Sequence, residues 1–421
     1  MSSLNLLGGL NRVESPFIKV QIGDYVFGVF NKTTVSKYDE SGIYRQHRIT
    51  YPNYIQSLSI KKINGQVNQY TLNISYPITQ GSDPNFFEKV FSSVSRSRKI
   101  VFSYGDCAMP NFLYKDEVAI IVDVQSQMSA SSPVIKYTVK ATSSAALAAS
   151  GSYNFKSRVA KPSDVIKELL KQNSKYGLQD VFTGMRDYDK VMSDGLILSN
   201  DKAVQIERKS NTSVFDYLSY LVSCMIPLSQ SGSSNSLSSI YGLVVVDDST
   251  GVYGGPYFKV VNVDKAKDSL GAYEIDIGYP SQNIVTEFSV DNNESYSIFY
   301  DYNTALHPEE YSYRINRSGE LEQVYSPMVS SGNRQYITTP SDKTWWSKVT
   351  EYPIKATLTL KGLLRPAILM THVRLNVYYY GQKHISSGLY IITSQQDWVG
   401  LGGNFKTTLT LTRIGGDEDY A

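Results

Sequence analysis

Apolar and polar side chains alternate along the stretch Tyr70-Thr71-Leu72-Asn73-Ile74-Ser75-Tyr76. A period of two residues is typical of a β-strand that buries one face, because successive side chains point to opposite faces of a sheet. The same alternation occurs in Ile18–Ile22 and Leu58–Lys61, and Asn64-Gly65 between two of these stretches is a common hairpin turn. The sequence therefore predicts antiparallel sheet on both sides of residue 64.

An amphipathic helix is predicted inside this β-rich region. It begins after Asp83-Pro84-Asn85, where apolar residues recur at helical spacing. These apolar residues are Phe86, Phe87, Val90, Phe91 and Val94. Further strands are predicted over 100–104, 118–124 and 135–141. We therefore expect residues 1–154 to form a sheet or barrel with one inserted helix.

A helical period begins near Ser163-Asp164 and predicts a small α/β module over residues 155–239. Ser163 is a favourable helix cap, and Asp164 suits the positive end of the helix dipole. A second helix is predicted from Thr212-Ser213 to Pro227. The apolar residues of the two helices are Val165, Ile166, Leu169, Leu170, Val214, Leu218, Leu221, Val222 and Met225. A serine-rich loop over 229–236 is expected to end the module.

Strand patterns return after residue 240. Residues 240–283 are predicted to be a short β connecting module with strands over 243–246 and 257–261. Residues 284–421 are predicted to be a second β domain that ends in a flexible acidic tail. Its strands are expected over 356–360, 373–380, 389–393 and 405–411. The expected fold class is mainly β with an α+β insert.

Two parts of the chain resemble each other. Both run strand, Tyr-Gly, strand closing on Ser-Gln, loop, strand. The first part is Ile100–Asp106, Ile120–Gln127 and Lys136–Thr142, and the second is Leu375–Gln382, Tyr390–Gln395 and Lys406–Thr412. Either threonine-rich strands resemble each other by composition alone, or the chain carries two copies of one β-domain. In the second case a trimer of this chain would imitate a hexamer.

Composition excludes several classes of protein. The chain has 421 residues, 41% hydrophobic and 19% charged, so we expect a globular protein rather than a disordered chain or a coiled-coil rod. Its net charge of +2 gives no reason to expect nucleic-acid binding. Cys107 and Cys224 cannot build a disulfide framework, and neither a signal peptide nor a membrane-spanning segment is expected. The 33 tyrosines favour half-buried sheet surfaces and interfaces.

The sequence predicts no enzyme, no cofactor and no metal site. The four histidines lack the spacing of a metal-ligand pair, and no phosphate-binding glycine loop occurs. The adjacent carboxylates Glu309-Glu310 and Asp247-Asp248 lie in turn-like sequence, where solvated loop charges are expected rather than a glycosidase pair. Basic clusters such as Lys61-Lys62 either contact an acidic partner or passing DNA, or are solvated strand ends.

The order β-domain, α/β insert, β-domain resembles that of the baseplate hub proteins of contractile phage tails. That family includes late-control proteins and the hub part of type VI secretion spike proteins. The resemblance is carried by this order, by the closing strand pair His384–Ile392 and Gly402–Leu411, and by the helix Ser213–Leu221, which looks like a segment of the insert in those proteins. It covers nearly the whole chain as patterns of strand and glycine.

The resemblance implies two tube-like antiparallel β-barrel domains flanking the α/β module, and a structural role without catalysis. Hubs of this family are homotrimers whose barrels form a pseudo-six-fold ring between the hexameric tail tube and a three-fold spike. The implied partners are a tail spike protein, here a separate chain, a tail tube or tube-initiator protein, and other baseplate proteins, with DNA passing through the lumen without specific binding. The implied location is the tail baseplate of a virion, assembled in the host cytoplasm and used in contractile injection and host cell entry.

Candidate interface residues are Trp345, Trp346, Tyr378, Tyr379 and Tyr380. Adjacent indoles on a strand cannot both face one core, so one of them is expected to reach a neighbouring chain unless the loop covers its own barrel. Two other functions stay open. One is a hub-like tail-tip protein of a non-contractile tail, and the other is a β-rich carbohydrate-binding or glycan-cleaving tail protein whose tyrosines and tryptophans would line sugar sites.

Overall fold

The structure is a computed structural model, and its described residues are mostly in β-strands. It describes residues 16–29, 33–38, 44–49, 52–93, 99–106, 114–129, 131–143, 146, 152–153, 156–173, 203–206, 212–223, 241–247, 257–262, 273–278, 285–292, 311–315, 321–325, 354–361, 369–370, 372–400 and 405–415. The expectation of a mainly β fold is confirmed.

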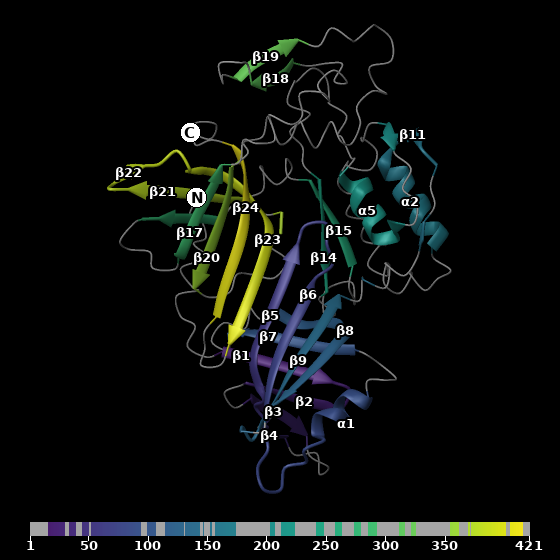
Figure 1. The fold of residues 1–421 in the computed structure, drawn as a ribbon, viewed down its shortest axis with the longest axis vertical. Coiled ribbons are helices and arrows are strands. Elements are labelled where there is room, and N and C mark those ends of the chain that lie inside the picture. Colours follow the sequence, from purple (N-terminus) through teal and green to yellow (C-terminus); the bar gives the residue numbers. More distant parts are fainter. Residues whose placement is uncertain are drawn as a thin grey trace.

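The first β region is a sheet that curls back on itself (Figure 1). Its strands run in the spatial order β5-β6-β9-β8-β7-β1-β2. They are β1 (Pro16–Ile22), β2 (Tyr25–Val29), β5 (Ile55–Ile63), β6 (Gln69–Pro77), β7 (Lys99–Asp106), β8 (Tyr114–Met128) and β9 (Val134–Ser143). The backbone amide of Gly28 in β2 donates to the carbonyl of Pro52, at 3.1 Å, just before β5 begins. This bond brings the last strand of the order back to the first, as in a barrel.

The predicted helix is α1 (Phe86–Ser93), and the predicted turn at Asn64-Gly65 is also present. Phe87 is fully buried and makes edge-to-face contacts with Phe27 and Tyr54. Such contacts favour ring centroids 4.5–7 Å apart, because the positive edge of one ring meets the negative face of the other. The helix therefore packs its aromatic stripe onto the core of the first β region. Val94, predicted in the same stripe, lies outside the described residues.

The second β region is built from strands of the chain's C-terminal third and from one earlier strand. Its spatial order is β17-β20-β24-β23-β21-β16, and β22 pairs with β21. The strands are β16 (Tyr273–Ile277), β17 (Val285–Asn292), β20 (Ile354–Lys361), β21 (His372–Tyr379), β22 (Gln382–Lys383), β23 (Gly388–Gly400) and β24 (Phe405–Gly415). Strand β16 comes from the predicted connecting module and pairs with β21 in parallel, so the sheet is not antiparallel throughout.

The two β regions form one continuous sheet because β23 belongs to both. The first part of β23 pairs with β21, from His372↔Ile391 to Leu375↔Gly388. Its last part pairs with β5, from Ser394↔Ile63 to Gly400↔Ser57. A register shift between Ile392 and Ser394 in its pairing with β24 lies where β23 passes from one neighbour to the other. Figure 1 shows β23 running down from the second region beside β5, with the antiparallel β24 on its other side.

Two cores lie on either side of this joint. The core of the first region includes Val399 of β23 and Phe405 of β24, so strands of the second region complete it. The core of the second region includes Val244 of β14 (Tyr241–Val246) along with residues of β20, β21, β23 and β24. Each core thus contains side chains that come from another part of the sequence.

The two stretches that resemble each other form the same local topology. In the first, β7 pairs with β8 and β8 with β9, all antiparallel. In the second, β21 pairs with β23 and β23 with β24, again antiparallel. Both are three-stranded meanders.

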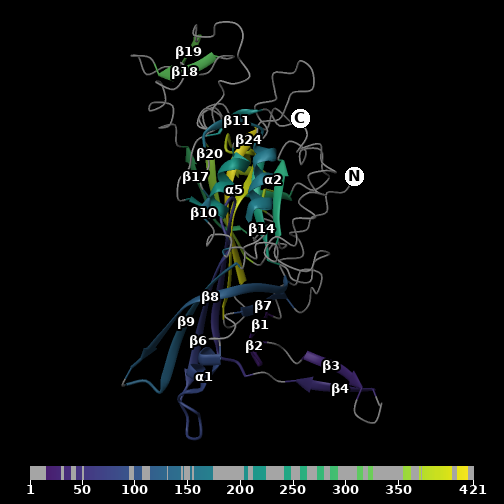
Figure 2. The ribbon, with the colours of Figure 1, turned by 90° about the vertical axis from the view of Figure 1, so that its right-hand side faces the viewer.

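The insert carries both predicted helices, α2 (Pro162–Asn173) and α5 (Val214–Ser223), which lie side by side (Figure 2). The Ser213 hydroxyl accepts a hydrogen bond from the backbone amide of Asp216, at 3.0 Å, and so caps α5. The described apolar residues of the predicted stripes are buried, whereas Leu170, Met225 and Pro227 lie outside the described side chains. The insert's short strands are β10 (Ser152–Tyr153), β11 (Arg158–Ala160), β12 (Val204–Ile206) and β13 (Thr212–Ser213).

Three hairpins complete the described chain. They are β3 (Thr33–Tyr38) with β4 (Tyr44–Ile49), β14 with β15 (Tyr257–Asn262), and β18 (Tyr311–Ile315) with β19 (Leu321–Tyr325). Among the described residues, no helix is both long enough and apolar enough to cross a membrane.

Candidate functional site

Strand β14 contacts three parts of the molecule. The backbone amide of Gly65 donates to the carbonyl of Leu243 at 2.8 Å, and the amide of Leu243 donates to Asn64 Oδ1 at 2.9 Å. These two bonds dock β14 on the β5–β6 turn of the first β region. Helix α5 packs on β14, and its Ser219 hydroxyl also donates to the carbonyl of Gly65, at 3.1 Å. With Val244 in the second core, β14 connects the insert and both β regions.

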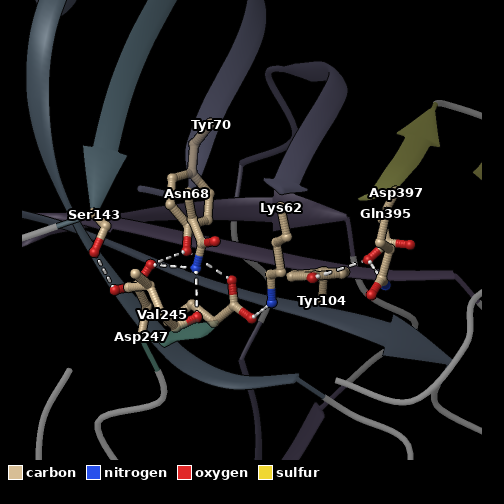
Figure 3. A network of polar contacts seen from close by, with 10 residues as sticks. Lys62, Asn68, Tyr70, Tyr104, Ser143, Val245, Asp247, Gln395 and Asp397 are labelled. Atoms are coloured by element: carbon tan, nitrogen blue, oxygen red, sulfur yellow. Dashed lines mark hydrogen bonds and ion pairs between the residues drawn. The ribbon is translucent and has the colours of Figure 1, made fainter. Parts of the chain in front are cut away.

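The end of β14 leads directly into a buried polar cluster (Figure 3). The carboxylate of Asp247 accepts hydrogen bonds from Asn68 Nδ2 at 2.9 Å, from the Tyr70 hydroxyl at 2.8 Å and from the Ser143 hydroxyl. The backbone carbonyl of Asp247 accepts from the amide of Val118 at 3.2 Å. Asp247 therefore fastens the end of β14 to strands β6, β8 and β9.

An ion pair lies next to Asp247 in the interior of the first β region. Lys62 Nζ is 2.5 Å from Glu117 Oε1, and the Tyr70 hydroxyl lies 2.9 Å from Glu117 Oε2. Burial opposes the charge on Lys62, but its attraction to Glu117, Asp397 and Asp247 raises its pKa. The ammonium is therefore held in its charged form. The ion pair places two opposite charges at fixed positions in the interior.

Burial also changes the titration of Asp247 and Tyr70. Loss of solvent raises the pKa of the Asp247 carboxyl to about 6, although the bonds from Ser143, Tyr70 and Asn68 act in the opposite direction. Burial, followed by the charges of Asp247 and Glu117, raises the pKa of Tyr70 well above its ordinary value. Tyr70 is therefore a neutral hydroxyl placed between two carboxyl groups.

These positions correct two expectations from the sequence. Asp247 was expected to be a solvated loop charge, but only 1% of its surface is exposed, because this residue, directly after β14, lies against strands β6, β8 and β9. Lys62 was expected at a solvated strand end or against an outside partner, but only 5% is exposed, because it shares the inward face of β5 with Leu58 and Ile60. Glu309 and Glu310 lie outside the described residues.

A second buried carboxylate lies on β23, close to the joint between the regions. Asp397 accepts from Gln395 Nε2 at 2.8 Å and from the Thr407 hydroxyl of β24 at 2.7 Å, and the Tyr104 hydroxyl lies 3.4 Å away. Burial raises the pKa of Asp397, while its donors and the charge of Lys62 lower it. Figure 3 shows Asp397 on one side of Lys62 and Asp247 on the other.

The arrangement is suited to holding strands of the two β regions together. All of the carboxylates in the cluster are at least 97% buried. Among the described residues, no group of three or more histidine, cysteine or acidic side chains could hold a metal ion. We call the set Lys62, Asn68, Tyr70, Glu117, Ser143, Asp247, Gln395, Asp397 and Thr407 the polar junction.

Of the predicted tyrosines, Tyr379 and Tyr380 lie at the tip of the β21–β22 hairpin, and Tyr378 is half-buried in β21, opposite Lys383. Tyr379 is 54% exposed and Tyr380 is fully exposed. Tyr380 has φ 50°, in the left-handed region, and Gly381 follows with φ 78°. Positive φ at both central residues of a two-residue turn matches the right-handed twist of a hairpin, but it is unfavourable for a tyrosine. Trp345 and Trp346 lie outside the described residues.

An open strand edge lies at the far end of β8. Strand β7 pairs with β8 only as far as Ile120, opposite Lys99, whereas β9 follows β8 to Met128. Along residues 121–128, no described strand lies on the other side of β8. This segment exposes Val122 and Met128, at 54% and 67%. This edge could not be predicted from the sequence, because it depends on where β7 ends.

No protein-family model matches the sequence, and no curated protein sequence matches it. Among solved structures, the chain is similar to a tail protein from Neisseria meningitidis, at 9% identity and a TM-score of 0.46 over 95% of this chain and 98% of that one. It is also similar to the 43 kDa tail protein of a Shewanella oneidensis prophage, at 9% identity and a TM-score of 0.42 over 95% and 99% of the two chains. A type VI secretion component of Escherichia coli aligns at 7% identity and a TM-score of 0.42, over 86% of this chain and 73% of that one.

Proposed function

We propose that this protein is a structural component of a phage tail, the baseplate hub that forms a trimeric ring between the tail tube and the spike. The observation that carries the proposal is the joint at β23, which makes one continuous sheet of two β regions separated in sequence by an α/β insert. A ring that bears load needs such a connection, because two separately folded domains on a linker would move independently.

Two surfaces of the described residues are suited to contacts between copies of this chain in the proposed ring. Among the described strands, none pairs with the outer side of β8 along residues 121–128, and this segment exposes apolar side chains, features that natural proteins avoid unless another strand or chain covers them. On the other β region, β17 is the last strand of the sheet order and exposes Val290. One edge on each β region, in the described part of the chain, suits head-to-tail addition, in which each copy gives one edge to the next and a rotation of one third of a turn closes the ring.

The tip of the β21–β22 hairpin, formed by Tyr379 and Tyr380, is proposed as a contact to a second partner, the spike or the tube. Trp345 and Trp346 are proposed to contribute to the same contact. Exposed aromatic side chains are frequent hot spots of interfaces, because they bury a large area at a small cost in side-chain entropy. Keeping a tyrosine at φ 50° costs backbone energy, which supports a role for the Tyr380 side chain outside its own fold.

The experiment is the mass of the purified protein by light scattering over a concentration series. We expect about three times 47.1 kDa. Val122→Lys on the open edge should shift the population to monomer, because a charge in the apolar contact must be desolvated. The matched control is Val159→Lys on β11, which is 42% exposed but lies in the insert. A wild-type monomer at all concentrations, with affinity for saccharides, would contradict the hub.

A further inference from the structure

The Tyr70 hydroxyl lies between two carboxyl groups and has a single proton. Its oxygen is 2.8 Å from Asp247 Oδ2 and 2.9 Å from Glu117 Oε2, and both distances are those of hydrogen bonds. One hydroxyl proton can be donated to one carboxylate only. If both carboxyl groups were ionised, the second contact would bring two oxygen lone pairs together in a buried site.

A second proton removes this conflict. With a proton on Oδ2, Asp247 donates to the Tyr70 oxygen, and Tyr70 donates to Glu117. Each of the two contacts then has one proton, and the only carboxylate charge of the three groups lies on Glu117, which faces the ammonium of Lys62 at 2.5 Å.

The surroundings decide which carboxyl group carries this proton. Glu117 has Lys62 as a direct cationic partner, whereas the direct partners of Asp247 are neutral, namely Asn68, Tyr70 and Ser143. The other charged group near Lys62 is Asp397 on β23, which competes for the same ammonium. The proton therefore belongs to Asp247, in agreement with the pKa of about 6 that burial gives this carboxyl.

We propose that Asp247, Tyr70 and Glu117 form a shared-proton latch that seats β14 on the first β region when Asp247 is protonated and loosens it when Asp247 is ionised. Loss of the proton places a second negative charge beside Glu117, at the end of the strand that connects the insert to both β regions. The affected contacts are those that dock β14, including the bond from Asn68 Nδ2 to the carbonyl of Val245 at 3.1 Å.

The direction of the pH effect follows from linkage. When β14 is detached, Asp247 titrates near its ordinary value of 3.8, and when β14 is seated it titrates at about 6. A raised carboxyl pKa gives stability that is complete below the lower value and is lost as pH rises through the higher one. Seating should therefore weaken by about tenfold between pH 5 and pH 7.5, with little further change above that.

The test is amide hydrogen exchange in residues 241–247, corrected for the intrinsic dependence of exchange on pH. Wild-type protein should be protected about tenfold more at pH 5 than at pH 7.5. Asp247→Asn should be equally protected at both values, because its amide supplies the missing donor without titrating. Asp397→Asn is the matched control, because it neutralises the other buried carboxylate. In this variant β14 should keep the wild-type difference in protection between pH 5 and pH 7.5, which we call the pH step.

Two results would overturn the latch: equal protection of wild-type β14 at both pH values, or an unchanged pH step in Asp247→Asn. If Asp247→Asn does not fold, Asp247→Ala takes its place. That variant should lose protection of β14 at both pH values without a pH step, and a remaining step would count against the latch. The experiment needs only the folded chain, so it fails or succeeds independently of trimer formation.

Discussion

Val399 of β23 lies directly opposite Leu58 of β5, and both side chains are fully buried in the core of the first β region. Val399 belongs to a strand that also pairs with β21 of the second region. Packing in one region therefore depends on the position of a strand that the other region holds.

Truncation at this joint should destabilise the protein. Val399→Ala removes two methyl groups from a closed site and should lower the free energy of unfolding by about 2 kcal/mol, from lost burial and the cavity left behind. Urea denaturation measures the loss. Val159→Ala on β11 is the control, because a valine that is 42% exposed and lies in the insert loses little on truncation. Equal losses of unfolding free energy in the two variants would contradict a stabilising role for the packing of β23 against β5.

The buried ion pair should respond very differently to single and double replacement. Lys62→Met leaves Glu117 charged without its partner and should cost about 3–5 kcal/mol. Lys62→Met combined with Glu117→Met removes both charges and should recover most of that loss, since the Tyr70 hydroxyl keeps its contact with Asp247. A double-mutant cycle by urea denaturation measures the coupling free energy between Lys62 and Glu117. Additive losses would show that the pair does not act as a unit.

The cap of α5 should account for a modest share of stability. Ser213→Ala removes the acceptor for the Asp216 amide and should cost about 1 kcal/mol. Ser92→Ala near the end of α1 is the comparison, because its hydroxyl is exposed and donates to a carbonyl of the same helix. Thermal unfolding of both variants measures the difference. Equal melting temperatures for Ser213→Ala and Ser92→Ala would show that the cap does not contribute to stability.

Tyr380 should show opposite effects on folding and on assembly. Tyr380→Gly relieves the left-handed backbone and should stabilise the isolated chain by about 1 kcal/mol. The same change removes the exposed ring and should weaken binding to the tail partner that contacts the tip. Denaturation and co-purification with candidate spike and tube proteins measure the two effects. Unchanged binding together with higher stability would remove the tip from the proposed interface.

Much of the fold could be predicted from local patterns. The period of two located β5 and β6, helical spacing located α1, and Ser213 marked the start of α5. These signals are local, because they depend on neighbouring residues alone. The division into domains at 154, 239 and 283 stays a prediction. The pairing of β23 with β5 had no local signal, since the two strands are far apart in sequence and either could have formed an edge.

The polar junction could have been found in part from the same alternation. Lys62 continues the inward series Leu58 and Ile60, and Asp397 stands two residues before the inward Val399. A charged residue at an inward position of a strand is either a break in the pattern or a buried charge that needs a partner. The partners themselves come from other strands, so the sequence could indicate buried charges but not that Glu117 faces Lys62 or that Asp247 enters the barrel.

The most direct test of the proposed hub is the appearance of purified particles in electron-microscope class averages. Three copies, each with two β regions joined through β23, should form a ring with six similar lobes around a central opening. A compact particle of one chain, or an assembly whose β regions do not alternate around a common axis, would contradict it.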